Sequence, residues 1–191
     1  MNNQYSLFSC EKYSVFITGD PDSGKSSIIA KYAQNQNFTG TRICTGIPYK
    51  HLLISGLKIR IEFVKYIQFE SNAYEIFTGL NDHFYPPASI FIVVFDKSNR
   101  KSFETIESWV EEYKRITNPR TCFMLVGNKC DLEPEVATDE GIEKALQYFM
   151  MYTETSIKTG KGINEMFEVV IRDQLSKKKS LWIDKFKNIL S

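Results

Sequence analysis

The sequence predicts an α/β domain built on a mostly parallel sheet, and three observations support this prediction. Apolar runs at 13–18, 89–96 and 122–128 have the length of strands, and each leads into glycine or polar residues. Apolar residues at helical spacing separate the later runs, so strand and helix alternate. A phosphate-loop pattern, "GDPDSGKS" at 19–26, lies between the first run and a helical segment. Ligands of such sheets bind beyond the carboxyl ends of the strands.

The first half of the chain predicts a strand at 13–18, a helix at 26–34 and an edge hairpin. The hairpin falls within 47–69, where "LKIRIEF" alternates apolar and polar residues as a half-exposed strand does. Ser55 and Gly56 supply its turn. The hairpin should therefore form one border of the sheet.

The second half predicts two helices between its strands and a third helix after the last strand. In "SNRKSFETIESWVEEYKRI" one helical face carries Phe103, Ile106, Val110 and Tyr113. A further helix is expected from Thr138 to Met151, a short strand over 152–154, and a last helix from Ile163 to about Leu175. Right-handed crossovers between parallel strands place such helices on the sheet faces.

Composition narrows the function classes. The 191 residues are 42% hydrophobic, which suits one globular unit. Because 24 basic residues nearly balance 23 acidic ones, nucleic acid is not expected as a partner. The four cysteines, Cys10, Cys44, Cys122 and Cys130, form no CxxC pair, which argues against zinc and disulfides. With no signal peptide or apolar span, we expect a cytoplasmic protein, at most peripheral to membranes.

The phosphate-loop pattern has a physical basis. Backbone N–H groups of the loop and the start of the helix attract phosphate oxygens. Lys25 should reach the outer phosphates, and the Ser26 hydroxyl should coordinate Mg²⁺ that bridges them. The residues expected to contact phosphate are Asp20, Pro21, Asp22, Ser23, Gly24, Lys25, Ser26 and Ser27.

Two further motifs follow the later strands, and the first of them points to guanine. "NKCD" at 128–131 follows the strand that ends near Gly127, and "ETSIK" at 154–158 follows the next one. A carboxylate at Asp131 can accept hydrogen bonds from both N1–H and N2–H of guanine, a donor pair that adenine lacks.

These three motifs, in this order, resemble those of the Ras superfamily of small GTPases over about 13–175. The resemblance implies a Ras-like G domain: a six-stranded sheet with helices on both faces and one antiparallel edge strand. It implies GTP or GDP and Mg²⁺ as ligands and effector or regulatory proteins at switch regions. The implied nucleotide contacts besides the phosphate loop are Phe38, which flanks guanine, Asn128, Lys129, Asp131, Ser156, Ile157 and Lys158.

Looser similarities favour the Rab branch and a role in vesicle traffic. "GDPDSGKSS" is similar to the Rab-type "GDSGVGKSS", and "FIVVFDKSNRKSF" is similar to "ILVYDVTDRESF". "FYPPAS" likewise resembles "YYRGAD". A small-molecule kinase also uses a phosphate loop, but "NKCD" and "ETSIK" argue against that alternative.

The chain departs from the family at the residues that sense the terminal phosphate. The family motif "DxxGQ" has no counterpart, since no aspartate occurs between Asp22 and Asp82. Counting from the start of the hairpin places Phe63 or Lys65 at the aspartate position of this motif. Counting back from Asp96 places Glu70 there. Two ways of counting also place either Cys44 or Thr45 at the switch threonine that binds Mg²⁺, and we prefer Thr45.

These losses predict a GTPase with very slow or negligible hydrolysis, because transition-state contacts are missing while ground-state contacts remain. The alternative is a pseudo-GTPase, an interaction module that holds GDP constitutively or no nucleotide. Asp22 should also weaken phosphate binding unless its carboxylate turns outward. Pro21 supplies no N–H.

The chain is expected to comprise an N-terminal extension at 1–12, the G domain at 13–176 and a basic, amphipathic helical segment at 177–191. The last cysteine is Cys130, so a prenyl anchor at the C-terminal end is not expected. On the last segment, one helical face carries Leu181, Trp182, Phe186, Ile189 and Leu190. It should dock on the domain or on a partner; a membrane surface and a further domain are the alternatives.

Overall fold

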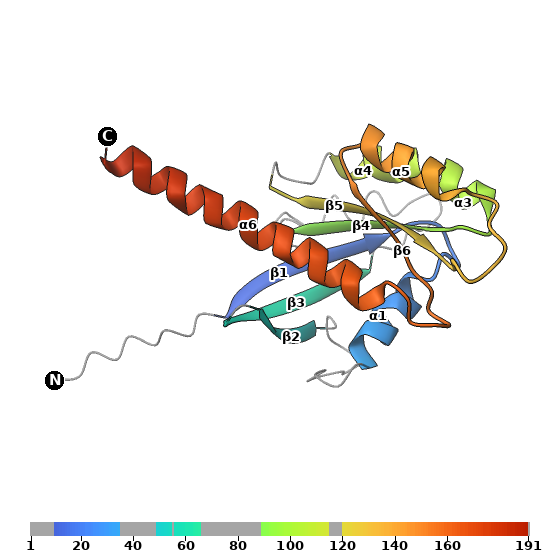
Figure 1. The fold of residues 1–191 in the computed structure, drawn as a ribbon, viewed down its shortest axis with the longest axis horizontal. Helices are drawn as coiled ribbons and strands as arrows, with labels where there is room; N and C mark the ends of the chain where they lie inside the picture. The colour runs from blue at the N-terminus through green and yellow to red at the C-terminus, as the bar shows by residue number, and fades with distance from the viewer. Residues whose placement is uncertain (1–9, 35–48, 55, 66–88, 115–119, 191) are drawn as a thin grey trace, which may run out of the picture.

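The computed structural model describes residues 10–34, 49–54, 56–65, 89–114 and 120–190 (Figure 1). In chain order the elements are β1 (Glu11–Thr18), α1 (Lys25–Gln34), β2 (Tyr49–Ile54), β3 (Leu57–Lys65), β4 (Ile90–Asp96), α3 (Arg100–Glu104), α4 (Ile106–Lys114), β5 (Cys122–Asn128), α5 (Thr138–Gln147), β6 (Met151–Glu154) and α6 (Ile163–Leu190).

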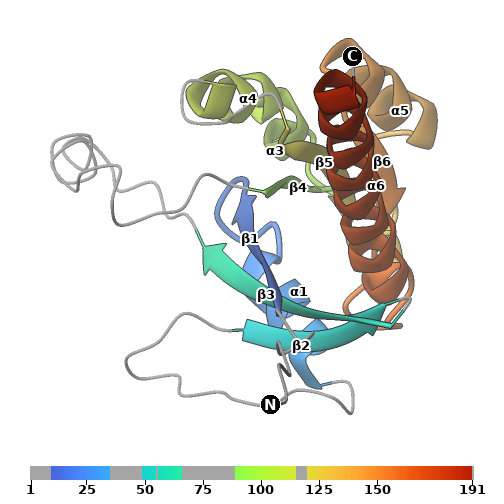
Figure 2. The same cartoon turned by 90° about the vertical axis from the view of Figure 1, so that its left-hand side faces the viewer.

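The six strands form one sheet in the order β2-β3-β1-β4-β5-β6. Strand β2 pairs antiparallel with β3, and the other neighbours pair parallel. Figure 2 shows the β2–β3 hairpin at one border of the sheet. The prediction of a mostly parallel sheet with one antiparallel edge strand is therefore confirmed.

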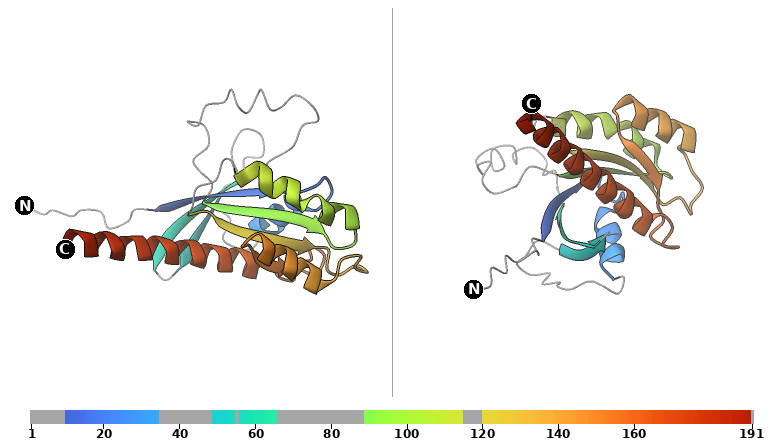
Figure 3. Two further views of the ribbon diagram at one scale, coloured as in Figure 1. Left: turned by 90° about the horizontal axis from the view of Figure 1, so that it is seen from above. Right: turned by 60° about the vertical axis from the view of Figure 1, so that its left-hand side comes forward.

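Two hydrophobic cores lie on opposite faces of this sheet. The first contains Val15, Ile17, Ile61 and Val126 from the strands, with apolar side chains of α1 and α6. The second joins Phe91, Val93, Phe95 and Leu125 to apolar side chains of α3, α4 and α5. Alternate residues of each strand point to opposite faces, so both faces of β4 are apolar and all its residues are buried. Figure 3 shows α6 and the α3–α4 pair on opposite sides of the strands.

The predicted helix after β4 is interrupted at Thr105, where α3 ends and α4 begins. The Thr105 hydroxyl lies 3.1 Å from the Ser102 carbonyl oxygen and 2.7 Å from a carboxylate oxygen of Asp20. A threonine that bonds back to the preceding turn competes with the helical ladder and bends the helix. Phe103, Ile106 and Val110 are buried as their spacing predicts.

The two last helices end elsewhere than predicted. Helix α5 stops at Gln147, because Phe149 has a left-handed backbone (φ 56°) and the Met150 N–H turns back to the Ala145 carbonyl at 2.8 Å. Helix α6 continues past Leu175 to Leu190, since 163–190 contain no glycine or proline that would stop it.

Helix α6 thus runs without a break through the expected domain boundary at 176–177. Lys178 forms an ion pair with Glu11 at the start of β1. The apolar face predicted for 181–190 lies outside the side chains that the structure describes. In the described part of the chain, no helix has the length and apolar character needed to cross a bilayer.

Candidate nucleotide site

The carboxyl ends of β1, β4, β5 and β6 meet at one edge of the sheet. The registers pair Thr18 with Val93, Asp96 with Asn128, and Gly127 with Glu154. The loops that follow β1, β5 and β6 carry "GDPDSGKS", "NKCD" and "ETSIK". Parallel pairing therefore brings three segments, distant in sequence, to the same edge.

The phosphate loop follows β1 as a tight turn with little room for side chains. Gly19 has φ +129°, and a Cβ there would lie 2.0 Å from the Val94 carbonyl oxygen. Gly24 has φ +98°, and a Cβ would lie 2.2 Å from Asn128 Nδ2. Both glycines are thus required by backbone geometry and close approach. The loop leads directly into the N-terminus of α1, the arrangement that attracts anions.

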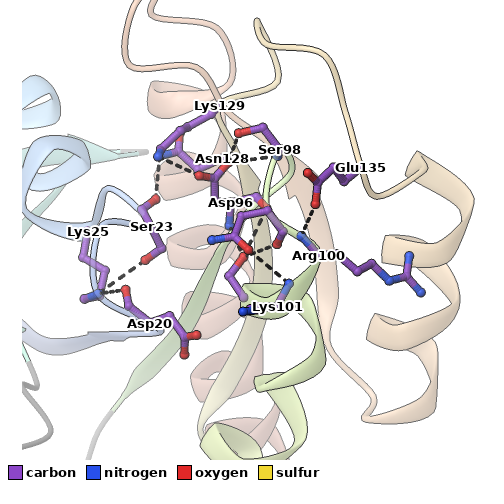
Figure 4. Close-up of polar contacts among 12 residues, drawn as sticks. Asp20, Ser23, Lys25, Asp96, Ser98, Arg100, Lys101, Asn128, Lys129 and Glu135 are labelled. Atoms are coloured by element: carbon purple, nitrogen blue, oxygen red, sulfur yellow. Dashed lines mark hydrogen bonds and ion pairs between the residues drawn. The ribbon is translucent and has the colours of Figure 1, made fainter.

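Lys25, the first residue of α1, folds back over this loop (Figure 4). Its ammonium donates to the Gly19 carbonyl oxygen at 2.8 Å and to the Asp20 carbonyl oxygen. It also lies 3.3 Å from Ser23 Oγ. Lys25 is only 8% exposed, so its charge is held at the inner side of the loop.

The two unusual loop residues point to solvent. Pro21 and Asp22 are both exposed, and Asp22 adopts a left-handed backbone with φ 61°. Aspartate tolerates that conformation better than most residues. The exposure of Asp22 meets the condition under which its carboxylate would repel phosphate less. Ser26 and Ser27 are exposed in the first turn of α1.

Asn128, at the end of β5, connects all three segments. Its side chain is fully buried, and Nδ2 donates to the Ser23 carbonyl oxygen at 2.8 Å. Its Oδ1 accepts from the Thr155 hydroxyl at 3.0 Å. Two backbone bonds reinforce the second link, from Thr155 N–H to Gly127 and from Cys130 N–H to Thr155. One amide therefore ties the phosphate loop to the loops after β5 and β6.

Asp131 lies beside the last motif. The Ser156 hydroxyl donates to Asp131 Oδ1 at 2.5 Å, which orients the carboxylate. Ser156 is fully buried and also accepts from the Thr159 N–H at 3.1 Å. Ile157 approaches the phosphate loop, since its Cδ1 lies 2.9 Å from where a Gly24 Cβ would be. Lys158 is exposed.

Lys129 and Asp96 form an ion pair between the ends of β5 and β4. Lys129 has a left-handed backbone (φ 59°), and its ammonium lies 2.6 Å from Asp96 Oδ2. Burial would raise the pKa of Asp96. Hydrogen bonds from Lys129 and Ser98, with the Lys129 charge, outweigh burial and lower that pKa. The carboxylate is therefore ionised at neutral pH and holds Lys129 at the sheet edge.

A second ion pair supports the neighbouring loop. Lys97 is buried, and its ammonium contacts the Glu154 carboxylate and lies 3.0 Å from the Thr138 hydroxyl. Tyr152 donates to the same carboxylate oxygen of Glu154 at 3.0 Å. The network joins the residue after β4, the end of β6 and the start of α5 at Glu154, the first residue of the "ETSIK" segment.

Several predicted residues cannot be placed. Phe38, Thr45, the alternative Cys44 and the alternative Glu70 lie outside the described residues. Phe63, one candidate for the missing aspartate position, is buried at 1% exposure against the rings of Tyr32 and Phe167. It belongs to the core and offers no ligand atom.

Other residues at this edge were not predicted. Thr155 orients Asn128, and Asp96 pairs with Lys129. Thr105 and Trp109 donate hydrogen bonds to Asp20. Only Asp96 had a usable signal, as the polar end of an apolar run. The other three act through contacts that join distant parts of the chain.

The described residues fit a nucleotide. Gly19 and Gly24 allow the tight turn of the loop against Val94 and Asn128, the loop leads into a helix N-terminus, and Lys25 supplies a cation. For Mg²⁺ the described part offers the Ser26 hydroxyl, and it contains no group of three or more His, Cys, Asp or Glu side chains suited to a metal. Phosphate oxygens would have to complete its coordination.

Comparison with known proteins identifies the family. A family model described as "Ras family" matches residues 14–176. The chain belongs to the Ras family. It is 31% identical to Ras-related protein RABA5d of Arabidopsis thaliana over 185 residues, covering 94% of this chain and 82% of that protein. It is 30% identical to Ras-related protein Rab-13 of Rattus norvegicus over 168 residues, covering 86% and 81%. These relatives make it a Rab-like small GTPase.

Proposed function

We propose that this Rab-like GTPase binds GTP and GDP at the edge described above, hydrolyses GTP very slowly, and acts in vesicle traffic. The observation that carries the proposal is the Asn128 amide, which joins the phosphate loop to the loops after β5 and β6. A site built from three separate segments needs such a link to hold one ligand at both ends.

Base selection is assigned to Asp131. Its carboxylate would accept from N1–H and N2–H of guanine, and the Ser156 hydroxyl at Oδ1 would keep it in that orientation. Adenine would leave the carboxylate without donors. An unsatisfied group of this kind disfavours the wrong base by about 1–3 kcal/mol or more.

Phosphate binding is assigned to the loop N–H groups and Lys25, with Ser26 toward Mg²⁺. Lys129 and Phe38 would line the base and Thr45 would reach the metal, as in the family. Asp22 opposes binding through its negative charge near the phosphates, although its exposure to solvent limits that repulsion. We infer weakened affinity rather than loss of binding.

Slow hydrolysis follows from the missing "DxxGQ" motif. Hydrolysis forms a bond from a water oxygen to the γ-phosphorus and breaks the bond to the β–γ bridging oxygen, giving GDP and phosphate. The chain has no aspartate between Asp22 and Asp82 to support the metal, and the sequence offers no glutamine in the motif to orient the water. Each lost transition-state contact costs on the order of 2–4 kcal/mol, so the rate falls by several powers of ten.

A pseudo-GTPase is the second candidate, and Asp22 together with the missing motif favours it. Such a module would hold GDP constitutively or no nucleotide at all. It would therefore show no exchange of GDP for GTP, and its partners would bind regardless of nucleotide.

The first test measures which nucleotide the purified protein contains. Titrations with GDP, GTP and ATP then give the three affinities. We expect guanine nucleotides to bind, with a D131A variant losing about tenfold or more of the preference over ATP. E133Q, an exposed change in the same loop, is the control. Equal affinity for ATP and GTP in the natural chain would overturn guanine selection.

Three further measurements test catalysis, metal dependence and exchange, and the last of them separates the switch from its alternative. Single-turnover phosphate release should be far slower than for an ordinary Rab, and a comparable rate would contradict the inferred loss of catalysis. Removing Mg²⁺ with a chelator should release little nucleotide, because the sequence has no aspartate between Asp22 and Asp82 to order the metal. Absence of GDP-for-GTP exchange would favour the pseudo-GTPase.

A further inference from the structure

The Asp20 carboxylate is held outside the phosphate loop by a second element. Its Oδ1 accepts from the Thr105 hydroxyl at 2.7 Å and from the Trp109 indole N–H at 2.8 Å. Trp109 is 5% exposed, and Thr105 stands at the junction of α3 and α4. Figure 4 shows the carboxylate pointing away from Lys25.

The same residue also touches the loop cation. The Asp20 backbone carbonyl accepts from the Lys25 ammonium. Its carboxylate is only a few bonds away from that carbonyl, so a rotation about the side-chain torsions would bring it within reach of Lys25. An Asp–Lys pair formed there would compete directly with a phosphate for the same cation.

We propose that Asp20 is a positioning residue of the phosphate loop, whose carboxylate Thr105 and Trp109 hold away from Lys25 so that it does not compete with phosphate. The inference rests on the proposed nucleotide binding. In this proposal the α3–α4 junction keeps the phosphate loop able to bind phosphate. The fluorescence of Trp109 should then respond to changes in that loop.

The proposal predicts an unusual order of affinities. T105V/W109F leaves the carboxylate without both donors, and GDP affinity should fall by about tenfold or more as the carboxylate turns to Lys25. D20A removes anchor and competitor together, and its loss should be smaller, about threefold. D20N keeps an acceptor oxygen for Thr105 and Trp109 without the charge, so it should lose less GDP affinity than T105V/W109F does.

The decisive variant is D20N/T105V/W109F. If the freed charge is the cause, neutralising Asp20 should restore most of the affinity that T105V/W109F loses. A merely structural role predicts the opposite, because the triple variant loses the same two donors and gains no packing. S108A, an exposed change on the same helix, is the control, and urea midpoints show which variants remain folded.

Tryptophan fluorescence tests the contact between Trp109 and Asp20 independently of nucleotide affinity. Trp109 and Trp182 are the two tryptophans of the sequence, so W182F leaves Trp109 as the sole emitter. In that background D20A should shift the emission of Trp109 and GDP should change it.

The outcomes distinguish failure of the positioning role alone from failure of both proposals. Unchanged emission in D20A, or a triple variant as weak as T105V/W109F, would overturn the positioning role while nucleotide binding stands. If the natural chain binds no guanine nucleotide, the proposed function and this inference both fail, whatever the emission shows.

Discussion

Replacing Asn128 with alanine removes one side chain and disconnects three segments. The amide makes two hydrogen bonds, at 2.8 and 3.0 Å, and it is fully buried. Removing one partner of a buried hydrogen bond costs about 1–3 kcal/mol, because the other partner is left unpaired. For the two bonds we expect a loss of about 3 kcal/mol of unfolding free energy, toward the lower end of the roughly 2–6 kcal/mol that this range gives.

The assay is urea unfolding at neutral pH together with GDP titration. For a domain of this size a loss of about 3 kcal/mol corresponds to a fall in Tm of roughly 6–12 °C. GDP affinity should fall further than D131A lowers it, because N128A releases the phosphate loop as well as the base loop.

A double-mutant cycle with T155V isolates the link between Asn128 and Thr155. N128A and T155V should be non-additive by about 1 kcal/mol, since either change removes the same hydrogen bond. S176A, a change of an exposed serine on α6, supplies the baseline. A loss below about 0.5 kcal/mol for N128A, or simple additivity with T155V, would refute the role given to this amide.

Two other predictions concern charge. Burial acts to raise the pKa of Glu154, but the hydrogen bonds from Lys97, Thr138 and Tyr152 and the Lys97 charge lower it below 4.5. The stability from this group is therefore present above about pH 4.5 and lost as pH falls through the lowered pKa, so acid titration of the urea midpoint should be less steep in E154Q than in the natural chain. At the phosphate loop, D22N should raise GDP affinity severalfold at low salt by removing a like charge. D22G removes the same charge at a left-handed position that glycine adopts readily, so its gain in affinity should be similar.

Controls for these predictions come from neighbouring groups. E168Q removes an exposed carboxylate paired with Arg172 and should leave the acid titration unchanged. An E154Q profile as steep as the natural one would show that this carboxylate does not set the acid limit. For Asp22, a gain in affinity that persists undiminished at high salt would rule out charge repulsion as its cause.

The fold was predictable because its signals are local. Runs such as 89–96 are apolar throughout, which is typical of a strand covered on both faces, and all of β4 is buried. The alternation of 57–63 identified the edge hairpin, because one face of β3 is exposed. The three motifs follow strand ends, so the parallel sheet alone brings them together.

The side-chain contacts within the candidate site could not be predicted, because they join residues that are distant in the sequence. Asn128 meets Ser23 across 105 positions, and Asp20 meets Trp109 across 89. Which donor reaches which acceptor is decided by rotamers and by the bend at Thr105, and these have no pattern along the chain. Helical structure was predicted both up to about Leu175 and over 177–191, but as two segments, whereas α6 is one helix over Ile163–Leu190.

The division of the core between two faces also sets an order of assembly. The face covered by α3, α4 and α5 can close once the chain has been synthesised through β6. The other face needs, besides α1, the side chains Ile163, Met166 and Phe167 of α6, which emerge from the ribosome after all six strands. Until then the buried side of the central strand β1 stays open on a nascent chain. That interval is when this domain is most exposed to aggregation and most in need of a chaperone.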